Sequence, residues 1–158
     1  MNLLKVSVII SVLNGSDKIK DTIESILNQV YSNFELIIID GGSTDNTVDI
    51  IKNFDLPKIK WISEPDKGIS DAFNKGIKLA TGDYINFQGD GDGFINNSSI
   101  SDLFTNLDLK DSPIVCGNIQ RIDIKGNLIY KTKIKKRFDK KSLLFKMSLP
   151  HQGLFISK

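Results

Sequence analysis

Two aspartates separated by one residue lie in the segment with the clearest chemical potential, Gly89-Asp90-Gly91-Asp92-Gly93. The segment directly follows residues 84–87, an apolar run typical of a buried strand. A hard divalent cation held by one or two carboxylates usually completes its shell with substrate phosphate oxygens, and the glycines would let a diphosphate approach closely. Asp and Gly are also common turn residues. The segment therefore indicates either a metal and diphosphate site or an ordinary polar turn.

Length and composition describe one globular domain, residues 1–158. Apolar residues at 40% and charged residues at 25% are ordinary for a soluble domain with a sizeable core. A net charge of +2 is too small to favour a nucleic-acid partner, and we expect none. The single cysteine, Cys116, cannot form an internal disulfide, which favours a reducing, cytoplasmic compartment. We expect neither a signal peptide nor a membrane-spanning run in this segment.

Strand and helix patterns alternate along the first 90 residues. Apolar runs predict strands at 6–12, 35–39, 58–62 and 84–87, and apolar periodicity predicts helices at 19–30, 43–54 and 69–80. We expect Ser16 or Asp17 to cap the first helix, and the second helix to begin at Ser43 or Thr44. Alternation with short connections is typical of an α/β fold, in which helices cover a mostly parallel sheet.

Polar loops follow the carboxyl ends of all four predicted strands. They contain residues 11–14, 40–43, 63–68 and 89–93. Ligands of parallel sheets bind outside the carboxyl ends of the strands, so the four loops should converge on one edge. This convergence favours the metal and phosphate site over the polar turn.

The order of these motifs resembles glycosyltransferase family 2, which has the Rossmann-like GT-A fold. The matching segments are 8–14 (VIISVLN), 38–47 (IIDGGSTDNT), 63–76 (SEPDKGISDAFNKG), 80–85 (ATGDYI) and 89–92 (GDGD). The resemblance is strong over residues 5–95, the expected nucleotide-sugar-binding half, and looser over 96–158, the expected start of an acceptor-side half. It implies inverting transfer of a sugar from a nucleotide diphosphate donor to an acceptor hydroxyl, with Mn²⁺ or Mg²⁺ on the diphosphate.

The resemblance also suggests which residues recognise the nucleoside. It places Asp40 against the base, and Ser11 and Leu13 where the first loop frames that base. A carboxylate can accept the N3 proton of uracil, which makes UDP the first expectation, with GDP and deoxythymidine diphosphate as alternatives. The other interpretation of Asp40 is a turn at the end of a strand. Gly41 replaces a commoner second aspartate, and Leu13 replaces a usual tyrosine.

For the diphosphate and ribose, the resemblance assigns Asp92 to the metal. Asp90 would then reach the ribose hydroxyls or the metal. Lys67 and Asp71 would lie beside the donor. The alternative for Asp71 is a surface ion pair with Lys75, four residues later on the same predicted helix.

The last third of the chain carries weaker patterns. Strands are predicted at 114–119 and 128–134. Lys131 to Lys141 contains seven basic residues and one acidic residue. This segment is either a solvated face or a contact with an anionic membrane surface or a lipid-linked acceptor at the inner face of the cell membrane.

No general base is assigned within the chain. The resemblance implies an acidic residue on a helix beyond Lys158, and His151, in a His-Gln pair that also resembles the family, is the weaker internal candidate. We therefore expect either part of an enzyme of bacterial surface polysaccharide synthesis, with a saccharide or lipid-linked acceptor, or a truncated donor-binding module without turnover. A nucleotidyltransferase is a third option, but its Gly-rich loop is absent.

We also expect an exposed apolar surface near Leu154 and Phe155, which would favour a homo-oligomer.

Overall fold

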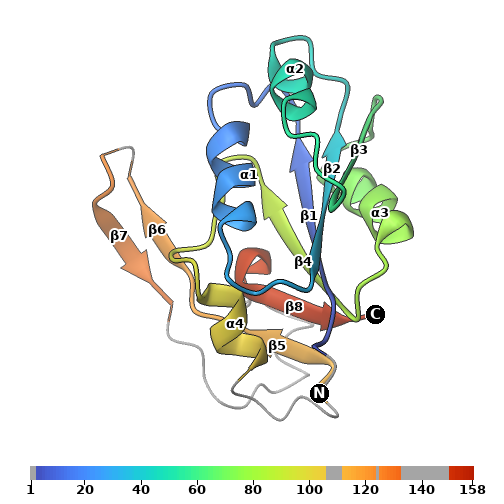
Figure 1. Ribbon diagram of the computed structural model, residues 1–158. Helices are drawn as coiled ribbons and strands as arrows, with labels where there is room; N and C mark the ends of the chain where they lie inside the picture. Colours follow the sequence, from blue (N-terminus) through green and yellow to red (C-terminus); the bar gives the residue numbers. More distant parts are fainter. Residues whose placement is uncertain (1–2, 106–111, 124, 133–149) are drawn as a thin grey trace.

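The computed structural model describes residues 3–105, 112–123, 125–132 and 150–158 (Figure 1). Six strands form one sheet in the order β3-β2-β1-β4-β8-β5. They are β1 (Val6–Val12), β2 (Phe34–Asp40), β3 (Ile59–Ser63), β4 (Tyr84–Gly89), β5 (Ile114–Cys116) and β8 (Leu154–Ser157). β1 to β4 run parallel, whereas β8 runs antiparallel to both β4 and β5. The predicted α/β fold with a mostly parallel sheet is confirmed.

Helices cover both faces of this sheet (Figure 1). They are α1 (Ile19–Leu27), α2 (Thr47–Lys52), α3 (Ile69–Leu79) and α4 (Ser99–Phe104). One buried cluster joins β1 to α1, α2 and α4, and includes Val8, Ile23, Ile51 and Ile100. The cluster on the other face joins Ile9 of β1 and Ile37 of β2 to Ala72 of α3. The β-branched side chains of β1 are therefore buried on both faces, as expected for a central parallel strand.

Three predictions about helix ends are wrong. α1 ends at Leu27 instead of residue 30, because Val30 turns outward and its N–H bonds to the carbonyl of Asn97 at 2.8 Å. Lys18, with no capping side-chain bond, precedes α1 in place of Ser16 or Asp17. α2 begins at Thr47, since residues 43–46 form hydrogen-bonded turns instead of a first helical turn.

The predicted strand 114–119 is shorter in the structure and ends at Cys116. Its strand part, β5, joins the main sheet, while β6 (Gln120–Ile122) begins after the predicted range and pairs with β7 (Leu128–Lys131) in a separate hairpin. The break comes at Gly117, whose N–H bonds to the carbonyl of Gly153 at 2.8 Å. The end of the predicted strand 128–134 and the basic residues from 133 to 141 lie outside the described residues.

The expected apolar surface near residues 154–156 is not found. β8 lies between β4 and β5, which leaves Phe155 only 1% exposed. The apolar side chains that do face solvent include Ile122, Leu128 and Ile129 of the β6–β7 hairpin. Homo-oligomer formation stays a prediction, but the apolar surface at residues 154–156 no longer supports it.

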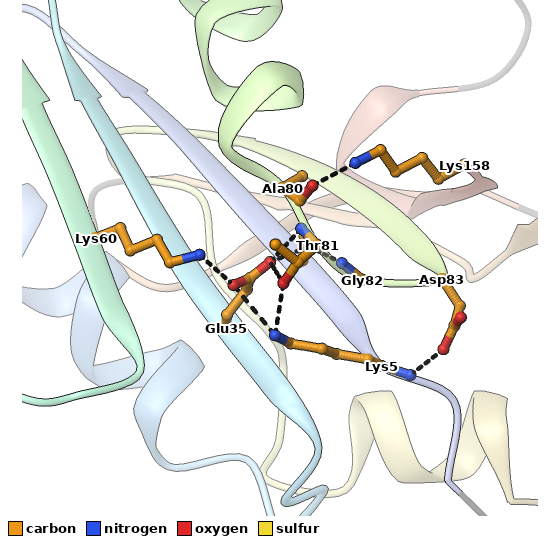
Figure 2. A network of polar contacts seen from close by, with 9 residues as sticks. Lys5, Glu35, Lys60, Ala80, Thr81, Gly82, Asp83 and Lys158 are labelled. Atoms are coloured by element: carbon orange, nitrogen blue, oxygen red, sulfur yellow. Dashed lines mark hydrogen bonds and ion pairs between the residues drawn. The ribbon is translucent and has the colours of Figure 1, made fainter.

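A buried carboxylate ties the strands together at the amino end of the sheet. The side chain of Glu35 on β2 is 4% exposed and forms ion pairs with Lys5 at 3.3 Å and Lys60 at 3.0 Å (Figure 2). It also accepts hydrogen bonds from the Ser7 hydroxyl at 2.7 Å and the Thr81 N–H at 2.6 Å. Burial alone would raise the pKa of Glu35, but these bonds outweigh it and lower that pKa to about 2.

We expect Glu35→Gln to lower the free energy of unfolding by about 3 kcal/mol at pH 7. Because the folded pKa lies below the usual value of 4.5, the stabilisation is complete above that value. It is then lost as the pH falls toward about 2. Urea unfolding at pH 7 and pH 3 measures both effects. Glu24→Gln, at an exposed position on α1, is the matched control, and an equal pH dependence in the two variants would contradict this role.

Candidate functional site

The register of the parallel strands brings the four predicted loops together. Asp40 of β2 pairs with Val12 of β1 and with Ser63 of β3, and Ser11 of β1 pairs with Gly89 of β4. The ends of β1 to β4 therefore lie side by side, and we call this region the carboxyl edge. It lies at the opposite end of the sheet from Glu35. The predicted convergence of the loops is confirmed.

The first two loops of the carboxyl edge are joined by side-chain to backbone bonds. Asn14, with a positive φ of 53°, receives a bond from the Thr44 N–H on its side-chain oxygen at 2.9 Å. The Asn14 N–H in turn donates to the Ser43 hydroxyl at 2.8 Å. The Gly15 N–H donates to the Thr47 hydroxyl at 2.9 Å. These bonds fix the loop after β1 on the loop after β2.

Asp45 forms part of the same junction. Its carboxylate accepts the Thr47 hydroxyl at 2.5 Å, the Thr47 N–H at 3.0 Å and the Ser16 N–H at 3.1 Å. The bond from the Thr47 hydroxyl is the largest cause that lowers the pKa of Asp45, to about 2. Asp45 is therefore ionised and engaged in loop structure at neutral pH.

Three of the predicted donor-binding residues remain accessible. Ser11 is half-buried beside Gly89, and Leu13 is 56% exposed on the loop that Asn14 fixes. Lys67 is exposed in the loop between β3 and α3. Ser11 and Leu13 thus remain accessible at the carboxyl edge, and their contact with the base stays a prediction.

Asp40 is fully buried, and the protein itself occupies its carboxylate. One oxygen accepts the Ser63 hydroxyl at 2.6 Å, the Ser43 N–H at 3.0 Å and the Gly42 N–H at 3.2 Å. The other oxygen accepts the hydroxyl of Ser43. A contact of Asp40 with the base would require one of these bonds to open, and this role stays a prediction. Asp40 forms the strand-end turn of the alternative interpretation.

The two aspartates after β4 point to different neighbours. One oxygen of Asp92 accepts the Gly89 N–H at 2.7 Å, and the other lies 3.5 Å from the side-chain nitrogen of Gln152. Asp90 lies over Gly15, since a Cβ added to that glycine would be 2.9 Å from a carboxylate oxygen of Asp90. Asp90 therefore faces the first loop, and Asp92 faces the segment before β8.

The central glycine of this turn serves packing against α1. Gly91 has a positive φ of 85°, and its N–H donates to the Thr22 hydroxyl at 2.9 Å. A Cβ on Gly91 would lie 3.0 Å from the Lys18 side chain. The glycine thus lets the turn sit on α1, a different reason from the diphosphate access that the sequence suggested.

The residues of this turn fit a divalent cation that takes its remaining ligands from a substrate. Among residues 3–105, 112–123, 125–132 and 150–158, no group of three or more His, Cys, Asp or Glu is placed to hold a metal. Asp90 and Asp92, both half-buried, supply hard oxygen ligands. Two carboxylates without a closed protein cage suit Mg²⁺ or Mn²⁺ bound together with phosphates.

A buried amide cluster supports this turn and was missed by sequence reasoning. The Gln88 side-chain nitrogen donates to the Asn86 side chain at 2.6 Å and to the Gln152 carbonyl at 3.0 Å. Asn86 donates to the carbonyls of Gln152 and Leu154 at 3.0 and 2.9 Å. The available signal was the pair of polar residues at alternating positions of an apolar strand.

The remaining predicted residues lie around α3. Asp71 accepts the Lys67 N–H at 3.1 Å and forms the predicted ion pair with Lys75 at 3.7 Å. Lys75 also pairs with Glu64 at 2.9 Å, and the hydrogen bond to Glu64 is the main cause that raises the pKa of Lys75. His151, in the short helix η2 (His151–Gly153), packs against the ring of Phe73 with centroids 6.0 Å apart.

Comparisons with known proteins identify the class to which this fold and site belong. The model of glycosyl transferase family 2 matches residues 7–156. An uncharacterized glycosyltransferase of Haemophilus influenzae is 37% identical over 147 residues, which cover 91% of this chain and 58% of the relative. The chain belongs to glycosyl transferase family 2, and it spans a little over half the length of this relative.

Two solved structures show the same fold. A mannosyltransferase of Pyrobaculum calidifontis, in complex with GDP-Man and Mn²⁺, aligns with a TM-score of 0.65 and 20% identity over 77% of this chain and 37% of its own. Residues 1–349 of S. aureus TarS, in complex with UDP-GlcNAc, align with a TM-score of 0.62 and 25% identity over 70% of this chain and 33% of their own. The fold of this chain is the expected GT-A fold.

Proposed function

We propose that the carboxyl edge binds a nucleotide diphosphate sugar with Mn²⁺ or Mg²⁺, and that the protein transfers the sugar to an acceptor hydroxyl with inversion. The observation that carries this proposal is the position of Asp90 and Asp92 at the end of β4, beside the loops after β1, β2 and β3. Ligands of parallel sheets bind at this edge, and the family supplies the type of substrate.

Asp92 and Asp90 would hold the metal, which offsets the diphosphate charge and stabilises the leaving nucleotide. Gln152, within 3.5 Å of Asp92, orients that carboxylate from the segment before β8. Ser11 and Leu13 frame the base from the first loop, and Lys67 lies beside the donor. The bonds from Asn14 and Gly15 hold this loop in place before the donor arrives.

UDP is the nucleotide that we propose for the donor. The TarS structure, which aligns with 25% identity, contains UDP-GlcNAc, and this supports a uridine donor without deciding the sugar. GDP and deoxythymidine diphosphate are the alternatives, because the same edge could hold either base.

The proposed acceptor is a saccharide or a lipid-linked sugar of a bacterial surface polysaccharide. The basic segment Lys131 to Lys141 would attract the anionic inner face of the cell membrane. Within the described part of the chain, no helix is long and apolar enough to cross a membrane. Contact with the membrane would therefore be peripheral for this part.

Donor binding without turnover is the second candidate. His151 is an internal base candidate that the sequence offered, and the described residues give its imidazole no hydrogen-bond or ion-pair partner that would orient it. An acidic helix in the reading frame after Lys158 would favour the enzyme over this alternative.

Calorimetric titration of the chain with UDP, GDP and deoxythymidine diphosphate in the presence of Mn²⁺ tests the proposal. We expect UDP to bind most tightly. Incubation with labelled UDP-sugars and a membrane extract then separates transfer to an acceptor from donor binding alone. Failure of all three nucleotides to bind would overturn the proposed donor site.

A further inference from the structure

The β6–β7 hairpin carries an exposed apolar surface that the proposed donor site does not use. All seven residues of its two strands are exposed. Four of them are aliphatic or aromatic, with exposed fractions of 59% for Ile122, 56% for Leu128, 57% for Ile129 and 46% for Tyr130. The hairpin forms a sheet of its own and stands apart from the main sheet (Figure 1). Because a two-stranded hairpin buries little by itself, this apolar surface indicates a partner.

Hydrogen bonds at both ends fix the shape of the hairpin. At the turn, the Asp123 carboxylate accepts the N–H groups of Lys125 and Asn127 at 2.8 and 2.9 Å, and the side-chain amide of Asn127 at 3.0 Å. At the open end, the Ile119 N–H donates to the Thr132 hydroxyl and the Thr132 N–H to the Ile119 carbonyl, both at 2.9 Å. The apolar side chains are therefore presented in one arrangement, and the one acidic side chain of the hairpin is engaged in its turn.

Positive charge is concentrated on this hairpin and on the residues that follow it in the sequence. Residues 121–141 contain nine basic and two acidic residues, a formal charge of +7. The rest of the chain contains twelve basic and seventeen acidic residues, a formal charge of −5. On the hairpin itself, Arg121, Lys125 and Lys131 are exposed. The apolar surface thus belongs to the one strongly basic segment of a chain that is otherwise acidic.

Apolar and basic side chains lie next to one another across the two strands. Ile122 pairs with Leu128, and the neighbouring pair is Arg121 with Tyr130. An anionic bilayer complements both kinds of side chain, since it offers an apolar interior below a negatively charged surface. A second copy of the chain complements them less well, because it would bring the same positive charge against this one.

We propose that the β6–β7 hairpin inserts its apolar side chains into the interface of an anionic lipid bilayer. Ile122, Leu128 and Ile129 enter the boundary of the acyl chains, while Tyr130 and the basic side chains lie among the headgroups. This inference rests on the peripheral membrane contact proposed above and adds the element that enters the lipid. It does not depend on donor binding.

Binding of the full chain to vesicles tests the insertion. Vesicles of phosphatidylcholine with phosphatidylglycerol should bind the chain at least about 10-fold more tightly than vesicles of phosphatidylcholine alone. The double variant Ile122→Thr with Leu128→Thr keeps every charge and the β-branched or strand-compatible character of this pair. It should bind the anionic vesicles about 10-fold more weakly, because two apolar side chains no longer enter the lipid. Leu56→Thr, at a 42% exposed position between α2 and β3, is the matched control and should bind normally.

A fluorescence measurement reports insertion directly. Trp61 is the single tryptophan of the chain, so Tyr130→Trp combined with Trp61→Phe places the only indole on the hairpin. Lipids brominated on their acyl chains should quench this indole on binding, whereas a hairpin attracted by charge alone would leave it unquenched. A thermal unfolding curve for each variant checks that the fold is retained.

The outcomes separate insertion from the other proposals. Weaker binding by the hairpin variant together with quenching would support the inference. Equal binding by the unmodified chain and the hairpin variant would overturn the insertion and leave attraction by the basic segment. Absence of binding to anionic vesicles would overturn the membrane contact as well. If the chain ignores vesicles but sediments as a dimer that the hairpin variant does not form, the surface joins two copies and the proposal is wrong. The UDP titrations test the donor site independently of all these results.

Discussion

Asp92→Asn is expected to abolish the Mn²⁺-dependent part of UDP binding. An amide oxygen is a much weaker ligand than a carboxylate, whereas it can still accept the Gly89 N–H that now bonds to Asp92 at 2.7 Å. The turn should therefore persist while the metal site fails. Removing even an outer-shell partner of a metal site costs about 10–100-fold, so we expect a loss of at least about 100-fold in the presence of Mn²⁺.

Two further variants make this prediction specific. Asp90→Asn should weaken metal-dependent binding less, because Asp90 faces Gly15 and would serve the ribose as well as the metal. Asp17→Asn removes an exposed charge near the same edge and should change little. An Asp92→Asn variant that binds UDP normally in Mn²⁺ would show that the metal is held elsewhere or is not used.

The second large effect is expected in stability. Asp40→Ala would remove the acceptor of bonds from Gly42, Ser43 and Ser63 at a fully buried position. We expect the free energy of unfolding to fall by about 3 to 5 kcal/mol, because several donors that converge on one buried carboxylate would lose their partner.

Urea unfolding measures this loss, and UDP titration of the fraction that remains folded completes the test. If Asp40 contacted the base directly, the variant would instead lose affinity with little change in stability. Ser43→Ala removes only the Ser43 hydroxyl, which donates to Asp40 and accepts the Asn14 N–H, and it leaves the carboxylate in place. This variant should give a smaller loss of stability.

The sequence predicted the parallel part of the fold well because each of its strands is a short run of mainly apolar residues. The run that predicted β1 corresponds to Val6–Val12 without adjustment. Boundaries set by loop bonds were less predictable. α2 starts late because Ser43 and Asp45 bond to residues on other loops, and periodicity carries no information on such long-range partners.

The location of the site could be predicted, whereas the orientation of its side chains could not. Strand ends converge in any parallel sheet, so the four loops were identified correctly. Asp40 and Asp66 are both aspartates of predicted loops, and only the structure shows which one is sealed by hydrogen bonds. The sequence indicated this arrangement only through Gly41. Because residue 41 has no side chain, it leaves space that the carboxylate of Asp66, from the loop after β3, fills.

The structure of the C-terminal part could not be predicted, because it depends on the pairing of β8 with two distant strands, which no local sequence pattern reveals. β8 enters the sheet between β4 and β5, which come 70 and 40 residues earlier when first residues are compared (154 − 84 and 154 − 114). This pairing buries Phe155 and brings Gln152 next to Asp92. The expectation of an exposed apolar end was wrong because it assumed that residues 154–156 have no partner on either side.

The central claim is that the carboxyl edge binds a nucleotide diphosphate together with a divalent metal. Calorimetric titration of the unmodified chain with UDP, once with Mn²⁺ and once with a chelator in its place, tests it most directly. We predict tight binding with Mn²⁺ and much weaker binding with the chelator, since two half-buried carboxylates would otherwise face the diphosphate without a cation between them. Equal affinity under the two conditions, or no binding under either, would contradict the account.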